Sequence, residues 1–183
     1  MKIRDVVIYT GQQFKVPQGI QRIDHRATHG WQLRYGGTRL FSDGQWNGDP
    51  AEALAQATKE LAARIASLPA PTRLQREPSQ HKSNDLPAGI NGPVVRQRKG
   101  SSIRTASFAV LVPVFGGKAK RRSVYIGSEA NYTIQRYEAA LARAIEIRRD
   151  AERAYEEAAT QAKRQEGRAL LGKPAGRGRK STT

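Results

Sequence analysis

The chain has 183 residues, no cysteine and a formal net charge of +16, with 32 Lys and Arg against 16 Asp and Glu. The lack of cysteine excludes disulfides, thiolate nucleophiles and cysteine-containing zinc sites. No apolar run approaches the ~20 residues of a membrane span, and the run at residues 6–9 is too short for a secretory signal. We therefore expect a soluble intracellular protein that does not contact membranes.

The first part of the chain predicts a short sheet followed by one helix. A β-branched cluster predicts a strand at residues 3–10, and residues 28–30 predict a turn. Residues 31–35 alternate apolar and polar side chains, and Gly36-Gly37 predicts a hairpin to a strand at 38–41. Asp49 and Pro50 predict the N-cap and first position of a helix that ends near Leu68. Its buried stripe is expected to be Ala53, Leu54, Ala57, Leu61 and Ile65.

The later part of the chain predicts the same order with longer strands. These strands are expected at residues 94–98, 107–115 and 121–126, with a turn at 116–118. Asn131 or Thr133 is the expected cap of a final helix. Helical propensity persists to about Arg164, farther than a three-stranded sheet extends, so the end of this helix projects, frays or meets a partner.

A repeat organises the chain into two modules. Pro-Gln-Gly-Ile at residues 17–20 returns as Pro-Ala-Gly-Ile at residues 87–90, and strands, a glycine turn and an Ala-rich helix follow each copy. This shared order predicts a duplication. We expect an α+β fold of two tandem modules, each a three-stranded antiparallel sheet packed on one helix. Their bounds are 1–68 and 87–160, with a linker at 69–86 and a disordered basic tail at 161–183.

Positive charge is concentrated in the second module. Residues 1–68 carry nine Lys and Arg against six acids, whereas residues 87–183 carry twenty against eight. No acid lies between Asp85 and Glu129, a stretch that contains eight Lys and Arg. Because folded surfaces usually intersperse both signs, this stretch indicates a polyanionic partner, with a merely solubilising surface as the alternative.

Short motifs in the first module resemble a known family of DNA-binding domains. They are Gly19-Ile20, Thr28-His29-Gly30-Trp31, Phe41-Ser42-Asp43-Gly44, Gly48 and Ala53-Leu54. The module resembles bacterial and phage relatives of the AP-two, or ethylene-response-factor (integrase-type), domain. The second module looks like a diverged copy, with Phe108 in the place of Trp31 and Tyr125-Ile126-Gly127 after its third strand. The resemblance implies a sheet whose exposed face enters the major groove, with contacts from arginines and a tryptophan.

The expected DNA-binding residues lie on or beside the strands. They are Arg22, Arg26, Trp31, Gln32, Arg34, Arg39, Arg96, Arg98, Lys99, Arg121 and Arg122. Arginine bonds guanine bidentately in the major groove. The strand at 107–115 has no basic residue, which favours phosphate contact from its neighbours over base readout. Trp31 is equally well explained as a core residue under the sheet.

The predicted function is double-stranded DNA binding without catalysis. We expect a transcription regulator or DNA-organising factor of bacterial or phage origin, in the cytoplasm at the nucleoid. No cofactor is expected, and His25, His29 and His81 lack the spacing of metal ligands.

The main alternative is a protein–protein adaptor or inhibitor. Phe108, Val110, Val112 and Phe115 predict a strand that is apolar on both faces. One face would then be covered by another part of the chain, a second copy in a homo-oligomer, or a foreign protein. RNA binding ranks third, because the deep and narrow groove of an A-form helix excludes a sheet.

Overall fold

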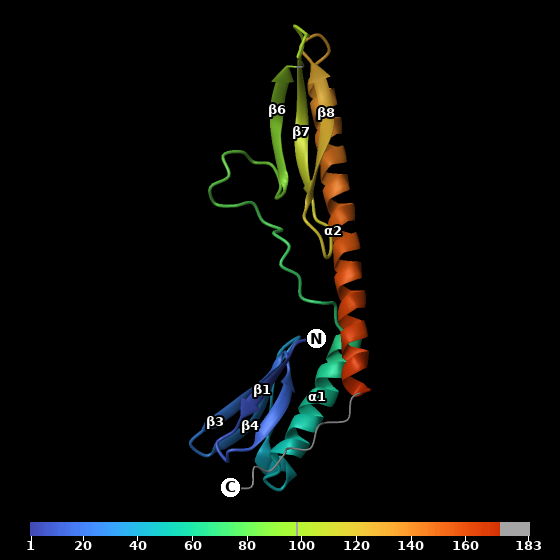
Figure 1. Ribbon diagram of the computed structural model, residues 1–183. Coiled ribbons are helices and arrows are strands. Elements are labelled where there is room, and N and C mark those ends of the chain that lie inside the picture. The colour runs from blue at the N-terminus through green and yellow to red at the C-terminus, as the bar shows by residue number, and fades with distance from the viewer. Residues whose placement is uncertain (98, 173–183) are drawn as a thin grey trace. The chain divides into compact units, whose positions relative to one another are not determined.

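The computed structural model describes residues 1–97 and 99–172 and shows an α+β chain with three antiparallel sheets and two helices (Figure 1). Contacts divide the chain into two compact units. Among the described residues, the first unit contains residues 1–70 and 160–172, and the second contains residues 71–159. Neither helix in these described ranges is long and apolar enough to cross a membrane.

The first unit combines a hairpin, a three-stranded sheet and a helix. Its elements are β1 (Ile3–Val7), β2 (Gln13–Pro17), β3 (Ile20–His25), β4 (Thr28–Arg34), β5 (Thr38–Ser42), a 3-10 turn (Asp43–Trp46) and α1 (Pro50–Ser67). The second unit contains β6 (Ile90–Gln97), β7 (Arg104–Val112), β8 (Lys120–Ser128) and most of α2 (Ile134–Leu171).

Two details of the first unit correct the sequence prediction. The strand expected at 3–10 ends at Val7 and pairs with β2, a strand that we did not predict. The turn expected at 28–30 lies instead at Arg26 and Ala27, where Arg26 takes a positive φ of 49°. Residues 28–30 instead extend β4, because they pair with the last residues of β3.

The core of the first unit lies between α1, the β1–β2 hairpin and one face of the β3–β4–β5 sheet. The predicted stripe from Ala53 to Ile65 is confirmed, since its five members are buried. The Asp49 carboxylate accepts from the Ala51 N–H at 2.8 Å, which confirms the predicted cap. Trp31 is fully buried, and its indole N–H donates to the Pro50 carbonyl at 2.8 Å.

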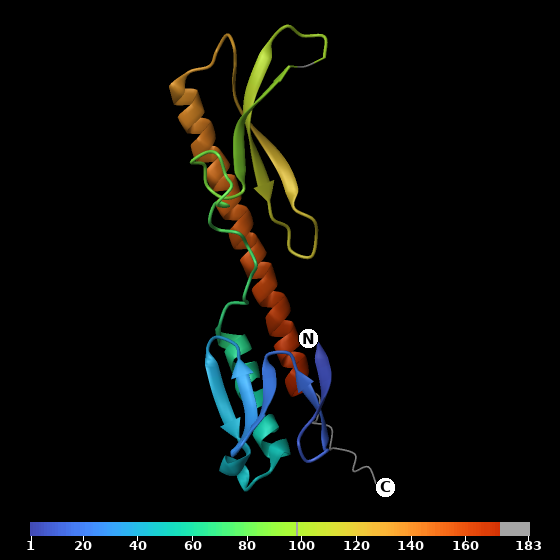
Figure 2. The same cartoon turned by 90° about the vertical axis from the view of Figure 1, so that its left-hand side faces the viewer.

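The core of the second unit lies between α2 and one face of the β6–β7–β8 sheet (Figure 2). Phe108 and Val110 of β7 are fully buried there, and Ala140 and Ala144 bring α2 close to them. The Thr133 hydroxyl accepts from the Arg136 N–H at 3.2 Å, so Thr133 caps the helix.

The end of α2 differs from the tail expected at residues 161–183. The helix continues to Leu171, and its last turns belong to the first unit. Leu170 packs against the first core, and Gly167 lies so close to Ile65 that a Cβ would approach its Cγ2 to 2.7 Å. These contacts stabilise a segment that would otherwise fray. Residues 173–183 of the expected tail lie outside the described residues.

The two three-stranded sheets share a backbone arrangement at corresponding positions. Gly19 and Gly89 both have positive φ. The Gly19 carbonyl accepts a hydrogen bond from β4, and the Gly89 carbonyl accepts one from β7. The donors are the N–H groups of Arg34 and Leu111, both at 2.7 Å. If Arg34 and Leu111 are equivalent positions, Leu33 corresponds to Val110 and Trp31 corresponds to Phe108, and all four residues are fully buried.

The segment expected as a linker, residues 69–86, contains no helix or strand, yet its end is held in place. Leu86 is buried in the second core. The Lys82 ammonium donates to the carbonyls of Leu86, Pro87 and Ile90 at 2.6, 2.6 and 2.8 Å. Burial lowers the pKa of Lys82, which is consistent with an ammonium that has exchanged water for carbonyl oxygens.

We predict that Lys82→Met destabilises the second unit by about 1–3 kcal/mol, because three carbonyls lose their charged donor. Native-state hydrogen exchange at the β6 and β7 amides measures the effect. Lys99→Met, in the exposed β6–β7 turn, is the control and should change stability by less than about 0.5 kcal/mol. Equal losses in both variants would show that the carbonyls do not depend on Lys82.

Candidate nucleic-acid interface

One face of the β6–β7–β8 sheet packs on α2, and the opposite face is available to a partner (Figure 2). Successive side chains of a strand alternate between faces, so the neighbours of Phe108 and Val110 point away from α2. Paired residues of antiparallel strands share a face. The register therefore defines an outer face, made of Asn91, Val94, Arg96, Thr105, Ser107, Ala109, Leu111, Arg121, Ser123 and Tyr125.

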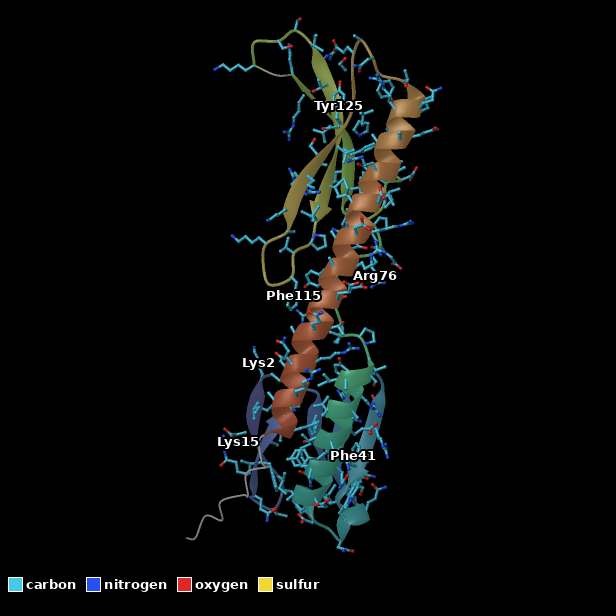
Figure 3. All side chains as sticks on the ribbon, turned by 90° about the vertical axis from the view of Figure 1, so that its right-hand side faces the viewer. Lys2, Lys15, Phe41, Arg76, Phe115 and Tyr125 are labelled. Carbon is cyan, nitrogen blue, oxygen red and sulfur yellow. The ribbon has the colours of Figure 1, made fainter. Side chains whose placement is uncertain are left out.

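The centre of the outer face consists of short side chains, and basic and aromatic side chains surround it. Ser107, Ala109 and Ser123 form the centre, because Ala109 pairs with Ser123 and their side chains are short. Arg96 and Arg121 are exposed on the two flanking strands. Tyr125 is 54% exposed on β8, where Figure 3 labels it. Such a surface allows close approach of a partner at the centre and offers charged hydrogen-bond donors beside it.

The turns that join these strands are also basic. Lys99 lies in the exposed β6–β7 turn, and Lys118 and Lys120 are exposed at the β7–β8 turn. Arg104 is paired with Glu129, so its charge is partly compensated. The predicted contact Arg98 lies outside the described residues.

Arg122 corrects one expectation about this face. We expected Arg121 and Arg122 to share it, but adjacent residues of a strand point to opposite sides. Arg122 pairs with the buried Val110 and therefore lies on the side of α2, whereas Arg121 pairs with the exposed Leu111 on the outer face.

The apolar strand that motivated the adaptor alternative is not apolar on both faces. β7 ends at Val112, which packs on the side of α2 against the second core. Phe115 lies beyond the strand and contacts Tyr155 edge to face, with ring centroids 5.6 Å apart. The outward residues of the strand include Ser107 and Ala109, and Leu111 is the large apolar residue among them.

In the first sheet, two predicted contacts are buried. Trp31 has no exposed surface, so it cannot reach DNA in this fold, and the core explanation holds. The Arg22 side chain is 5% exposed. Its guanidinium donates to both carboxylate oxygens of Asp43 at 2.9 and 2.6 Å and lies 5.0 Å from the centre of the Trp31 ring. Arg22 is therefore a structural residue, because it pairs with Trp31 across the inward face.

Electrostatics strengthen this cluster. Burial alone would lower the pKa of Arg22, but hydrogen bonds to Asp43 and Asp24 outweigh it and raise that pKa. Burial likewise favours a higher pKa of Asp24, and hydrogen bonds from Arg22 and His29 outweigh it, so the pKa of Asp24 is lowered. The charged forms of both residues are thus favoured by the fold.

The other predicted contacts of the first sheet are divided between its two faces. Arg39 lies on the side of α1, 3.7 Å from Glu60 and over the Phe41 ring. Phe41 is the buried residue of β5, and Arg39 shares its face because alternate residues of a strand point the same way. Gln32 and Arg34 lie on the outer face, where the Arg34 Nε–H donates to Gln32 at 2.6 Å. Arg26 is exposed in the β3–β4 turn.

Sequence reasoning overlooked Tyr125 and the small residues beside it. Val124 and Ile126 are buried, so period-two alternation alone places Tyr125 outward. The short side chains of Ser107, Ala109 and Ser123 carried no such signal, because their importance depends on the register between β7 and β8.

Comparison of the chain with protein-family models, with curated proteins and with solved structures gave no match.

We predict that Arg22→Met lowers the free energy of unfolding of the first unit by about 3–5 kcal/mol, because the buried Asp43 carboxylate loses its bidentate partner. Both tryptophans, Trp31 and Trp46, lie in this unit, so their fluorescence during urea unfolding reports the change. Arg39→Met, whose side chain is 58% exposed, should cost about 1 kcal/mol or less. Similar costs for the two variants would contradict a structural role for Arg22.

We predict that acid destabilises the first unit partly through Asp24. Its pKa in the folded chain lies below the ordinary value of 3.8, so its stabilising effect is complete above that value and is lost as the pH falls through the folded pKa. In Asp24→Asn, tryptophan-monitored unfolding should therefore show lower stability at neutral pH and a smaller decline in acid. The same decline in both proteins would exclude Asp24 as a contributor.

Proposed function

We propose that the protein binds double-stranded DNA through the outer face of the β6–β7–β8 sheet. The observation that carries this proposal is a solvent-facing sheet surface with two arginines, a tyrosine and no acidic residue. A small ribbon of strands fits the major groove of B-form DNA. The acid-free stretch from Leu86 to Ser128 supplies its strands and turns, so a polyanion meets little repulsion there.

The arrangement supports two kinds of contact. Arg96 and Arg121 emerge from the flanking strands, where a guanidinium reaches base edges or phosphates. Lys99, Lys118 and Lys120 sit at the turns, which suits phosphate contacts on either side of a groove. The side chains of Ser107 and Ala109 are short, which allows the backbone of the middle strand to come near the bases.

A duplication is part of the proposal. The paired glycines, the two equivalent 2.7 Å hydrogen bonds and the corresponding core positions support an origin of the two sheets from one module. The resemblance of the first module's motifs to the AP-two domain is proposed together with this duplication. A transcriptional or DNA-organising role in a bacterium or phage follows from that resemblance and is proposed with it.

The neighbouring arginines of β8 provide a matched pair of variants. Arg121→Gln should weaken binding to a duplex clearly more than Arg122→Gln, because Arg121 alone of the two lies on the outer face. If Arg121 contacts a phosphate, its loss also reduces the slope of log affinity against log salt by about 0.9. Fluorescence anisotropy with a labelled duplex at several salt concentrations measures both quantities.

An equal or larger loss for Arg122→Gln would place the interface elsewhere. Affinity that does not respond to salt, or no duplex binding at low salt, would exclude DNA as the partner. Tyr125→Ala provides a further arm without a change in charge, and it should weaken binding while leaving the salt slope intact.

A further inference from the structure

A pocket of about 430 Å³ in the first unit has three basic residues in its lining. It opens where β1 and the residue before it meet the start of β3 and the end of β4. Lys2, Arg4 and Arg34 contribute its charge, Gln18 and Gln21 contribute amides, and Ile3 contributes an apolar wall that is 46% exposed. None of the residues that line it is acidic.

Hydrogen bonds hold both arginines of this pocket in position. One terminal N–H of Arg4 donates to the Ile20 carbonyl at 2.9 Å. The Nε–H of Arg34 donates to Gln32 at 2.6 Å, and its backbone N–H donates to Gly19 at 2.7 Å. Each guanidinium keeps further donors for a ligand, since it has five N–H groups in all. The side chains are thus partly ordered before a ligand binds, which reduces the entropy lost on binding.

The carboxylate next to this pocket in the sequence is occupied elsewhere. Asp5 follows Arg4 directly and so points to the other side of β1, where it pairs with Lys15 at 3.2 Å. Three cations therefore surround one space without a neutralising group in its lining, and an anion relieves their repulsion.

We propose that this pocket binds the phosphate group of a nucleotide. Two arginines and a lysine match a phosphate better than a single carboxylate, because guanidinium donors form paired hydrogen bonds with phosphate oxygens. The volume lies in the range of small-ligand sites, and Ile3 offers apolar surface to a sugar or base. The same chemistry is available from a free nucleotide or from the backbone of a nucleic acid strand.

The site is independent of the proposed duplex interface. Its residues belong to the first unit, whereas Arg96 and Arg121 belong to the second. Binding of a free nucleotide therefore reports on the pocket whether or not the β6–β7–β8 sheet binds DNA.

The test uses the ¹⁵N-labelled full chain, with chemical shifts of the Gly19, Ile20 and Arg34 amides as the readout. AMP and inorganic phosphate at millimolar concentration should shift these amides in a saturable way, and adenosine, which lacks the phosphate, should not. The double variant Arg4→Gln with Arg34→Gln should weaken AMP binding by about tenfold or more. Lys15→Gln removes a charge from the same hairpin outside the pocket and should have little effect.

Titration with a short duplex distinguishes the two sources of phosphate. Shifts of the same amides, reduced in the double variant, identify backbone phosphates as the ligand, and AMP binding without such shifts identifies a free nucleotide. Equal responses to adenosine and AMP, equal losses in Lys15→Gln, or unchanged AMP affinity in a folded double variant would overturn the proposal. Loss of duplex binding in Arg121→Gln with AMP binding retained would show that the pocket and the duplex interface are separate sites.

Discussion

The burial of one sheet face by one helix is the constraint on which the rest of this structure depends. Phe108 and Val110 are fully buried on the side of α2, and alternation along β7 then sends Ser107, Ala109 and Leu111 outward. The register carries the same division to β8, where it separates Arg121 from Arg122. A slip of one residue would exchange these arginines and expose the core, so core packing and the candidate interface are determined together.

The two sheets use a similar backbone for different purposes. In the first unit, a basic and an aromatic side chain are buried in the core, where Arg22 pairs with Asp43 and lies over Trp31. Its outer face retains Gln32 and Arg34, beside a basic pocket at the edge. In the second unit the core is wholly apolar at the matching positions, and the arginines of β6 and β8 remain in solvent. We therefore propose different ligands for the two units: a phosphate group for the first and a DNA groove for the second.

Much of the fold could be predicted from local pattern. The stripe of α1, its Asp49 cap and the Gly36-Gly37 hairpin each follow from a few neighbouring residues with one clear physical reading. The docking of Leu170 could not, because it depends on a contact between segments far apart in the sequence. The strand β2 was overlooked although it directly follows β1 in the chain. Among the site residues, Arg22 and Arg39 were predicted as DNA contacts, but the ion pair with Asp43 and the burial of Phe41 place them on the inward face. Tyr125, by contrast, was recoverable from its buried neighbours.

The absence of native cysteine makes one measurement especially direct, since a single introduced thiol is unique in the chain. Ala109→Cys and Ser123→Cys place that thiol at the centre of the outer face, and Ala142→Cys places it on the exposed side of α2. The rate of maleimide modification is then compared with and without saturating duplex DNA. We predict strong protection at positions 109 and 123 and none at 142. Protection at 142 alone, or equal rates at all three positions in the presence of bound DNA, would contradict the proposed interface.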